Sequence, residues 1–327
     1  MKIKNIIKLA SAILIALLII LFLFKYIDLK DISTAFSELS LSIIIGTFII
    51  YIILNIFRTE RMNLLLKRKL KFKLLFPIMI IHNMFSNLLP FRIGELSFVY
   101  FVKRTKKVSA GYSIGSLLIA RIFDLIAAAV LFIIAIFFLV EIPAIFFKAL
   151  IAISIILGLI ILCLIFLIFF DRTALKIMDK IIALFRMKKL KPVLWGYEKI
   201  EEILESLHAI QSKKIIFWTL IFSLLIWLCQ YSIAYFIFIG LGLEMTFFVA
   251  IAIVTFNTLT AILPIQGIGG FGTSEGALTI AFLGLGFPAA VAISSGFVLH
   301  IILVLYFLIL GIFGLIMFKY FMKKKYA

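Results

Sequence analysis

The sequence has few of the residues that a metal site, a disulfide framework or a catalytic centre requires. Its 327 residues include two cysteines, three histidines and 15 acidic residues. Cys163 and Cys229 lie in apolar segments, where cysteine usually packs as a small hydrophobic residue. No glycine-rich nucleotide loop followed by Lys-Ser/Thr and no serine elbow of an acyl hydrolase is found. We therefore expect no metal, no cofactor and no catalytic residues.

Apolar residues, in contrast, dominate the chain. They make up 65% of it, and the mean hydropathy is +1.28. A soluble protein of this length cannot bury that much apolar surface, so the composition predicts an all-α polytopic membrane protein. The net charge is +18, but the basic residues gather at the ends of apolar segments. That placement is typical of residues that orient a membrane protein, and we expect no nucleic-acid partner.

Six apolar segments are long enough to cross a bilayer, which takes about 20 residues of helix. The first lacks the small-residue cleavage site of a signal peptide, so we interpret it as a retained span. The six predicted spans are Ile6–Phe24, Leu41–Phe57, Ala110–Val140, Ile142–Phe170, Ile215–Leu241 and Ala289–Phe318.

Two further apolar segments are interrupted by polar breaks and continue as legs too short to span. The pairs of legs are Leu74–Leu89 with Ser97–Val102, and Thr246–Leu263 with Ala277–Leu285. Lys73 and Lys103 flank the first pair, and the positive-inside rule assigns both to the cytoplasm. The first pair is therefore predicted to be a re-entrant hairpin, and the second a re-entrant hairpin from the opposite face. The alternative is two full spans in each place.

Basic residues also set the orientation of the chain in the cell membrane. Lysines cluster in residues 2–8 and 323–325, which predicts that both termini are cytoplasmic. Arg58 and Arg61 are counted here with the basic cytoplasmic loop that follows the second span.

The order of these elements suggests an inverted repeat within a single membrane domain, 1–327. Half A, 1–141, and half B, 142–327, each contain span, span, hairpin and span. Glu95 lies 26 residues before Arg121, and Glu275 lies 25 residues before His300. Inverted repeats whose broken helices meet at the midplane are a transporter architecture.

Half B also carries an insert, 171–214, with two amphipathic patterns separated by basic residues. We place it in the cytoplasm. It is either a packed connector between the halves or a segment that binds anionic lipids at the cytoplasmic face.

Two arginines are expected at membrane depth. Arg121 lies about 11 residues into its span, roughly 16 Å from the start and near the centre of the bilayer core. Arg121 with Asp124, and Arg92 with Glu95, have the i, i+3 spacing of pairs on one helical face. Such pairs either lock helices together or present Arg92 and Arg121 to a phosphate, whose oxygens a guanidinium matches in a forked geometry.

The remaining ionisable residues at this depth have alternative interpretations. Asp124, Glu95 and Glu275 either balance the arginines or carry protons. Glu275 is otherwise a cap of the helix that follows it, and His300 an interior histidine with satisfied hydrogen bonds. His82 and Asn83 in the first hairpin are weaker candidates.

The two polar breaks contribute mainly through the conformation of their backbone. Pro90 stops a helix, and glycines allow tight turns and close approach of a ligand to the backbone. The residues expected to shape the two breaks are Asn87, Pro90, Gly94, Pro264, Gly267, Gly269, Gly270 and Gly272.

These motifs together resemble a known family. The run Asn87–Glu95, the pair Arg121-x-x-Asp124, and Leu263-Pro264 followed by the glycines and Glu275 are similar to the transmembrane region of lysylphosphatidylglycerol synthases. The same region occurs as a stand-alone, flippase-like family. This chain departs from the family pattern at Gly94-Glu95-Leu96, where Gly-Gly-Asp is common, and at Gln266, where a second proline is common.

The resemblance implies translocation of a lipid by a protein that is not an enzyme, because no aminoacyltransferase domain accompanies the membrane domain. It leaves the cargo open between aminoacyl-phospholipids, polyprenyl-phosphate sugars and hopanoids. We therefore expect a flippase or scramblase for a phosphate-containing membrane lipid, either passive or driven by an ion gradient. The alternatives are an ion-coupled secondary transporter of a small solute and a membrane transferase acting on lipid-linked substrates. The oligomeric state is left open.

Overall fold

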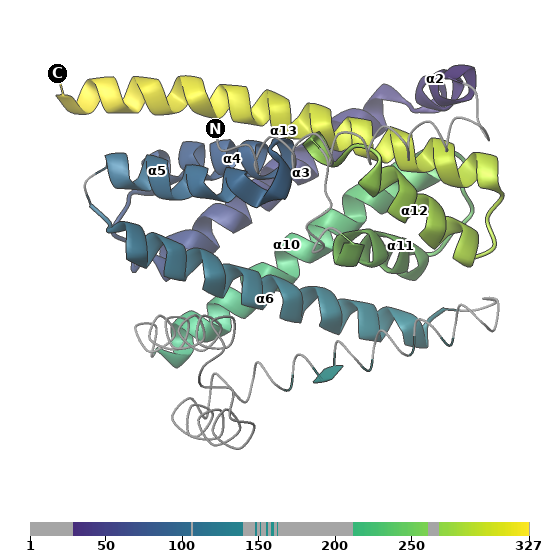
Figure 1. The fold of residues 1–327 in the computed structure, drawn as a ribbon, viewed down its shortest axis with the longest axis horizontal. Coiled ribbons are helices and arrows are strands. Elements are labelled where there is room, and N and C mark those ends of the chain that lie inside the picture. The colour runs from purple at the N-terminus through teal and green to yellow at the C-terminus, as the bar shows by residue number, and fades with distance from the viewer. Residues whose placement is uncertain are drawn as a thin grey trace, which may run out of the picture.

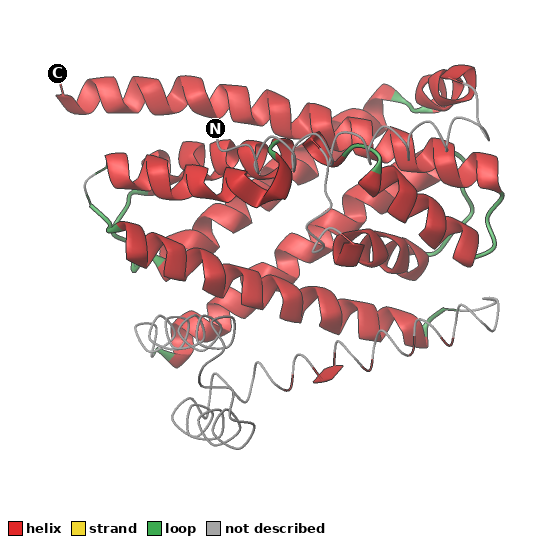
Figure 2. Ribbon diagram, viewed as in Figure 1, coloured by secondary structure: helices red, strands yellow, loops and turns green. Residues whose placement is uncertain are grey.

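The computed structural model describes residues 29–105, 107–139, 212–260 and 268–326, with a few isolated residues between 148 and 162. Within these ranges the regular elements are all helices (Figures 1 and 2). They are α2 (Leu29–Glu38), α3 (Leu41–Leu65), α4 (Phe72–Leu88), η1 (Pro90–Glu95), α5 (Leu96–Arg104), α6 (Ala110–Phe137), α10 (Lys213–Gly240), α11 (Phe247–Thr260), η3 (Ile268–Gly270), α12 (Thr273–Gly284) and α13 (Ala289–Tyr326).

Four of these helices, α3, α6, α10 and α13, are long and apolar enough to cross a membrane. They confirm four of the predicted spans: 41–57, 110–140, 215–241 and 289–318. The predicted span 6–24 lies outside the described residues, as do most of the span 142–170 and most of the insert 171–214. The total of six spans and the inverted repeat therefore stay predictions.

Helix α3 is longer than its apolar run. It starts at the cap Ser40, whose hydroxyl accepts from the Ile43 N–H, and it ends at Leu65. Arg58 and Arg61 consequently lie inside the helix, and Arg61 is only 5% exposed. The prediction that both belong to a basic cytoplasmic loop is wrong. Their guanidinium groups bind side chains on other helices, which hydropathy does not detect.

The two predicted pairs of short legs are helical hairpins. Helix α4 packs against α5 across η1, and α11 packs against α12. Figure 1 shows α4 and α5 in one half of the molecule and α11 and α12 in the other, so the hairpins point toward each other. The turns η1 and η3 contact each other, and η3 also contacts α4. That the hairpins are re-entrant in a bilayer remains a prediction.

The turn after α4 follows from a proline and a glycine. Leu89 is extended (φ −88°, ψ 134°), as expected before a proline, and Pro90 begins η1 without needing a partner for an N–H. Residues 90–95 then fold back onto the last turn of α4. A Cβ at Gly94 would collide with the backbone carbonyl of Phe85. Gly94 is thus required by the close approach of two backbone segments.

Helix α13 packs closely against α4 through glycines. A Cβ at Gly311 would meet the side chain of Met84, and one at Gly314 would meet Ile80. In lipid, small residues allow such close helix contacts, which then gain dispersion energy.

One end of the bundle concentrates the basic residues. The end of α5, the start of α6 and the C-terminal end of α13 lie at the left of Figure 1. The end of α3 joins them there, since Tyr112 of α6 donates to the Leu65 carbonyl and Lys69 Nζ lies 4.6 Å from the Tyr112 ring centroid. The basic residues of these helix ends are Lys67, Arg68, Lys69, Lys71, Lys73, Lys103, Arg104, Lys107, Lys319 and Lys323.

We expect Gly94→Ala to destabilise the protein by about 1–3 kcal/mol, the usual cost of overpacking a close contact. Gly46→Ala is the matched control, because a Cβ there meets nothing within 4 Å and alanine is the better helix former. The measurement is the temperature at which the detergent-solubilised protein loses its monodisperse elution peak. Equal transition temperatures for the two variants would contradict the packing of η1 on α4.

Candidate functional site

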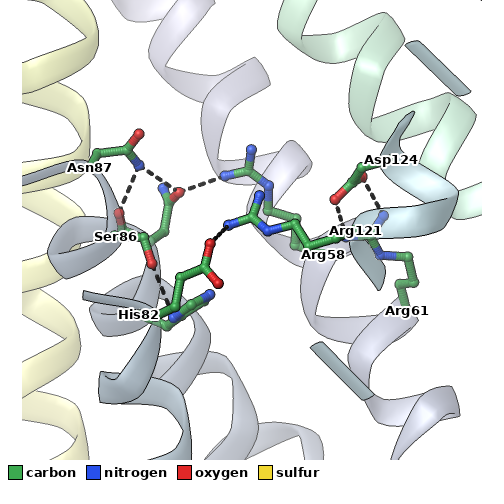
Figure 3. Close-up of polar contacts among 9 residues, drawn as sticks. Arg58, Arg61, His82, Ser86, Asn87, Arg121 and Asp124 are labelled. Atoms are coloured by element: carbon green, nitrogen blue, oxygen red, sulfur yellow. Dashed lines mark hydrogen bonds and ion pairs between the residues drawn. The ribbon is translucent and has the colours of Figure 1, made fainter. Parts of the chain in front are cut away.

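A bidentate ion pair joins three of the long helices. Arg61 on α3 donates to both oxygens of Asp124 on α6, at 2.5 and 3.0 Å. The same guanidinium donates to the Ser223 hydroxyl on α10 at 2.7 Å. Figure 3 shows the two side chains meeting face to face. Arg61 is 5% and Asp124 18% exposed, so a buried guanidinium and a partly buried carboxylate join these helices.

A second ion pair connects α6 to the first hairpin turn. Arg121 donates to Glu95 Oε1 at 3.0 Å (Figure 3). Its side chain is 47% exposed and that of Glu95 is 28% exposed, so this pair is far more accessible than Arg61–Asp124.

The predicted pairing of Arg121 with Asp124 along one helix is therefore wrong. Both oxygens of Asp124 are taken by the forked guanidinium of Arg61, and Arg121 turns to Glu95 on η1. The backbone of Arg92 lies in η1, but its side chain lies outside the described residues, so its predicted pairing with Glu95 stays a prediction.

The third arginine, Arg58, faces the end of α4. It donates to Asn83 Oδ1 at 2.7 Å, and Asn83 in turn donates to the Tyr51 hydroxyl. Asn87 donates to the backbone carbonyl and side-chain oxygen of Asn83, at 2.7 and 3.1 Å. An amide network thus positions Arg58 beside the hairpin turn (Figure 3).

Positive charge exceeds negative charge in this cluster. Its described members are three guanidinium groups and two carboxylates, and the partner of Arg58 is a neutral amide. Arg58 and Arg61 lie three residues apart on α3, Arg121 and Asp124 lie three residues apart on α6, and the Arg61–Asp124 pair joins the two helices, so the groups lie close together. A cluster with surplus guanidinium charge in an apolar surrounding favours an anion as its further partner.

The second hairpin turn holds a buried dyad. His300 Nδ1 lies 2.6 Å from Glu275 Oε1, and His300 Nε2 lies 2.9 Å from the Gly269 carbonyl. The other oxygen of Glu275 accepts from the Gly272 N–H at 2.7 Å. Glu275 is fully buried. Glu275 thus accepts from the backbone of the N-cap Gly272 at the start of α12, and His300 has two partners in the interior. A proton-carrying role for either residue stays a prediction.

The hydrogen-bond partners of this dyad determine how many protons it carries. A carbonyl oxygen only accepts, so His300 Nε2 carries a proton, and a second proton lies between Nδ1 and Glu275 Oε1. The dyad is neutral as a whole, whether that second proton belongs to the histidine or to the carboxyl.

Glycines make the second turn possible. Gly269, Gly270 and Gly272 have φ of 65°, 78° and 81°, in the left-handed region that other residues avoid. Gly270 also faces the His300 ring, since a Cβ there would lie 3.5 Å from Nε2. Pro264 and Gly267 lie outside the described residues.

Glu95 and Arg121 are separated in the sequence by almost the same distance as Glu275 and His300, and each acidic residue contacts its partner. Glu95 in η1 pairs with Arg121 of α6, and Glu275 at the start of α12 pairs with His300 of α13. In each case an acidic residue beside a hairpin turn binds the long helix that follows. Since η1 touches η3, the two pairs lie on neighbouring turns.

The sequence analysis missed Arg58 and Arg61 as site residues. The signal was present in α3, where every fourth residue of an apolar helix is polar and buried: Thr47, Tyr51, Asn55 and Thr59. A polar stripe of this kind faces protein rather than lipid. Arg58 and Arg61 flank its end.

No group of three or more His, Cys, Asp or Glu side chains could hold a metal ion in the part of the chain that the structure describes.

Comparison with known proteins identifies one family. The model of the family described as the lysylphosphatidylglycerol synthase TM region matches residues 9–311. No curated protein and no solved structure matches the chain.

The two ion pairs predict losses of stability of different size when the carboxylate is replaced by its amide. Asp124→Asn leaves the buried Arg61 without its counter-charge, and we expect it to destabilise the protein by about 3–5 kcal/mol. Glu95→Gln alters an accessible pair and should cost at most about 1 kcal/mol. Thermal unfolding in detergent measures both. A larger loss of thermal stability in Glu95→Gln than in Asp124→Asn would contradict the assignment of Arg61–Asp124 as the pair that stabilises the fold.

Proposed function

The chain belongs to the family of the lysylphosphatidylglycerol synthase transmembrane region, and on that premise we propose that it moves a phosphate-bearing lipid between the leaflets of the cell membrane. The observation that carries the proposal is the surplus of guanidinium charge beside the first hairpin turn. Four long apolar helices and the family identify a multi-pass membrane protein. Within such a protein, an anion at this cluster arrives most simply as a lipid headgroup.

Arg121 and Arg58 are the proposed phosphate ligands. Arg121 is half-exposed and donates one N–H to Glu95, and its other N–H groups can donate to an incoming phosphate. Arg58 approaches from the opposite helix and is held in place by Asn83. Two guanidinium groups from different helices suit a phosphodiester, which presents two unesterified oxygens. Arg61 is excluded because Asp124 and Ser223 occupy it, and Arg92 remains a proposed additional ligand.

Glu95 has a positioning role in this proposal. It holds Arg121 against η1 while the site is empty, and it would release part of that contact when phosphate arrives. The carboxylate thus competes with the headgroup, which keeps binding reversible, as transport requires. The acyl chains stay in the surrounding lipid.

The second turn is the proposed place for proton coupling. The Glu275–His300 dyad is neutral, buried and adjacent to η1 through η3. Loss or gain of its shared proton would charge a buried site, which is unfavourable unless the turn moves or opens. The headgroup site and the dyad therefore lie on two turns that can influence each other.

We expect Arg121→Gln to abolish most lipid translocation while leaving the protein folded, since the Arg121–Glu95 pair is accessible and contributes little to stability. The assay uses vesicles with fluorescent phosphatidylglycerol, in which flipped lipid is protected from a membrane-impermeant quencher. Arg104→Gln is the matched control, because it removes the same charge at a residue stacked on Tyr100 and away from the cluster.

Unchanged translocation by Arg121→Gln would overturn the role of Arg121 as a phosphate ligand. Movement of a water-soluble solute with no lipid movement in wild-type vesicles would replace the flippase with a secondary transporter. Native mass spectrometry of the same two variants adds a readout that does not need transport, because wild type should retain a phosphate-bearing lipid that Arg121→Gln loses.

A second prediction concerns the dyad. Glu275→Gln keeps an oxygen to accept from the Gly272 N–H but removes the titratable carboxyl. We expect translocation by this variant to be insensitive to an imposed proton gradient, whereas the wild-type rate should depend on that gradient. The measurement is the same vesicle assay with equal and with unequal pH across the membrane. Equal gradient dependence in both proteins would remove Glu275 from proton coupling.

A further inference from the structure

A pocket of about 360 Å³ lies between the end of α3 and the start of α10. Its walls come from both helices, which pack against each other along the bundle. The lining residues are Glu60, Leu64, Arg68, Lys214, Ile215, Trp218 and Phe222. Neither the ion pairs nor the hairpin turns described above use these side chains.

The mouth of the pocket is positively charged. Arg68 follows α3, Lys214 is in the first turn of α10, and both are exposed. They outnumber the one acidic lining residue, Glu60. Two cations, one from the turn after α3 and one from α10, suit a phosphate, whose oxygens can accept from both at once.

The backbone that presents Arg68 is unusual. Lys67 and Arg68 have φ of 49° and 54°, so two successive residues other than glycine adopt the left-handed conformation. The turn is held by the Arg68 N–H, which donates to the Asn63 carbonyl at 2.8 Å. Such conformations are disfavoured for side chains with a Cβ and are concentrated where a residue is held for a ligand. Here the turn presents Arg68, which lines the same pocket as Lys214.

The remaining walls are apolar and aromatic. The rings of Trp218 and Phe222 lie 6.1 Å apart, and Phe222 contacts Phe57 of α3 at the same distance. Trp218 is 42% and the neighbouring Phe217 57% exposed, as expected of residues at the boundary between lipid and headgroups. A soluble anion would gain nothing from this wall, whereas a lipid chain would pack along it.

We propose that this pocket is a second lipid site, which binds the anionic headgroup of a phospholipid in the leaflet that the positive-inside rule assigns to the cytoplasm. Arg68 and Lys214 hold the phosphate, and the first part of an acyl chain lies against Trp218, Phe222 and Leu64. Glu60 accepts a hydrogen bond from a hydroxyl donor of the headgroup. The site is independent of the central arginines, so it stands whether or not the chain moves lipid.

The pocket adjoins the structural ion pair through the chain itself. Glu60 precedes Arg61, and Phe222 precedes Ser223, which accepts from Arg61. A lipid held in the pocket therefore braces the same two helices that the Arg61 network joins. The bound lipid should therefore also stabilise the fold.

The test uses Trp218 as a reporter in the full-length chain, with Trp195 and Trp227 replaced by phenylalanine. Phosphatidylglycerol with brominated acyl chains is titrated into protein in nanodiscs of phosphatidylcholine, and quenching of Trp218 fluorescence reports occupancy. We expect saturable quenching by phosphatidylglycerol. In Arg68→Gln/Lys214→Gln, the half-saturating lipid fraction should rise at least about tenfold, because two charge-assisted hydrogen bonds are lost.

Two controls separate this site from the rest of the protein. Lys103→Gln/Arg104→Gln removes the same charge from the same end of the bundle but outside the pocket, and should quench like wild type. Arg121→Gln should also quench like wild type, so failure of the central site is distinguished from failure of the pocket. Thermal unfolding with and without phosphatidylglycerol confirms that each variant is folded.

Three results would overturn the proposal. Equal quenching by brominated diacylglycerol would show that the chains bind without a phosphate. Equal weakening in the Lys103→Gln/Arg104→Gln control would show a diffuse attraction to the basic end rather than a site. Displacement of the lipid by millimolar inorganic phosphate would show that the pocket binds the free anion and that the aromatic wall contributes nothing.

Discussion

A guanidinium enclosed by helices needs a carboxylate, and the arrangement of this bundle depends on how Arg61 obtains one. Both oxygens of Asp124 serve it, and Ser223 takes a further N–H. Three helices from distant parts of the sequence are thereby held at fixed separation. Both oxygens of Asp124 accept from Arg61, and Arg121 on the same helix binds Glu95 instead. This second, more accessible pair holds the first hairpin turn against α6.

The hairpin turns depend on backbone geometry at very few positions. Gly94 allows η1 to lie against the Phe85 carbonyl, and three left-handed glycines shape the second turn. Each turn is then tied to the following long helix by one acidic side chain, through Arg121 in the first case and His300 in the second. The chemical difference between these partners matters for function. Arginine keeps its charge, whereas the histidine and its carboxylate share a proton, so we propose the first turn for the anion and the second for proton coupling.

Charge is distributed along the bundle as well as within its centre. Basic residues crowd the end where α3, α5 and α13 finish, and the pocket with Arg68 and Lys214 belongs to that end. The central cluster and the pocket are both positive, but they differ in their surroundings. Arg121 and Arg58 contact a carboxylate and an amide, whereas Arg68 and Lys214 line a pocket with aromatic side chains. The first is therefore the proposed transport site and the second the proposed lipid anchor.

The sequence by itself determined the membrane class, four helices that the structure confirms, the two broken segments and the family. These features are local: about 20 apolar residues predict a span, and proline and glycine end helices wherever they lie. Only the tertiary structure decided that Arg61 holds Asp124, that Arg121 binds Glu95 and that Arg58 donates to Asn83 of α4. The i, i+3 spacing predicted a pair within α6, but a carboxylate binds the guanidinium whose fork reaches both its oxygens, and that depends on the distance between helices. Helix packing sets this distance, and no pattern along one segment contains it.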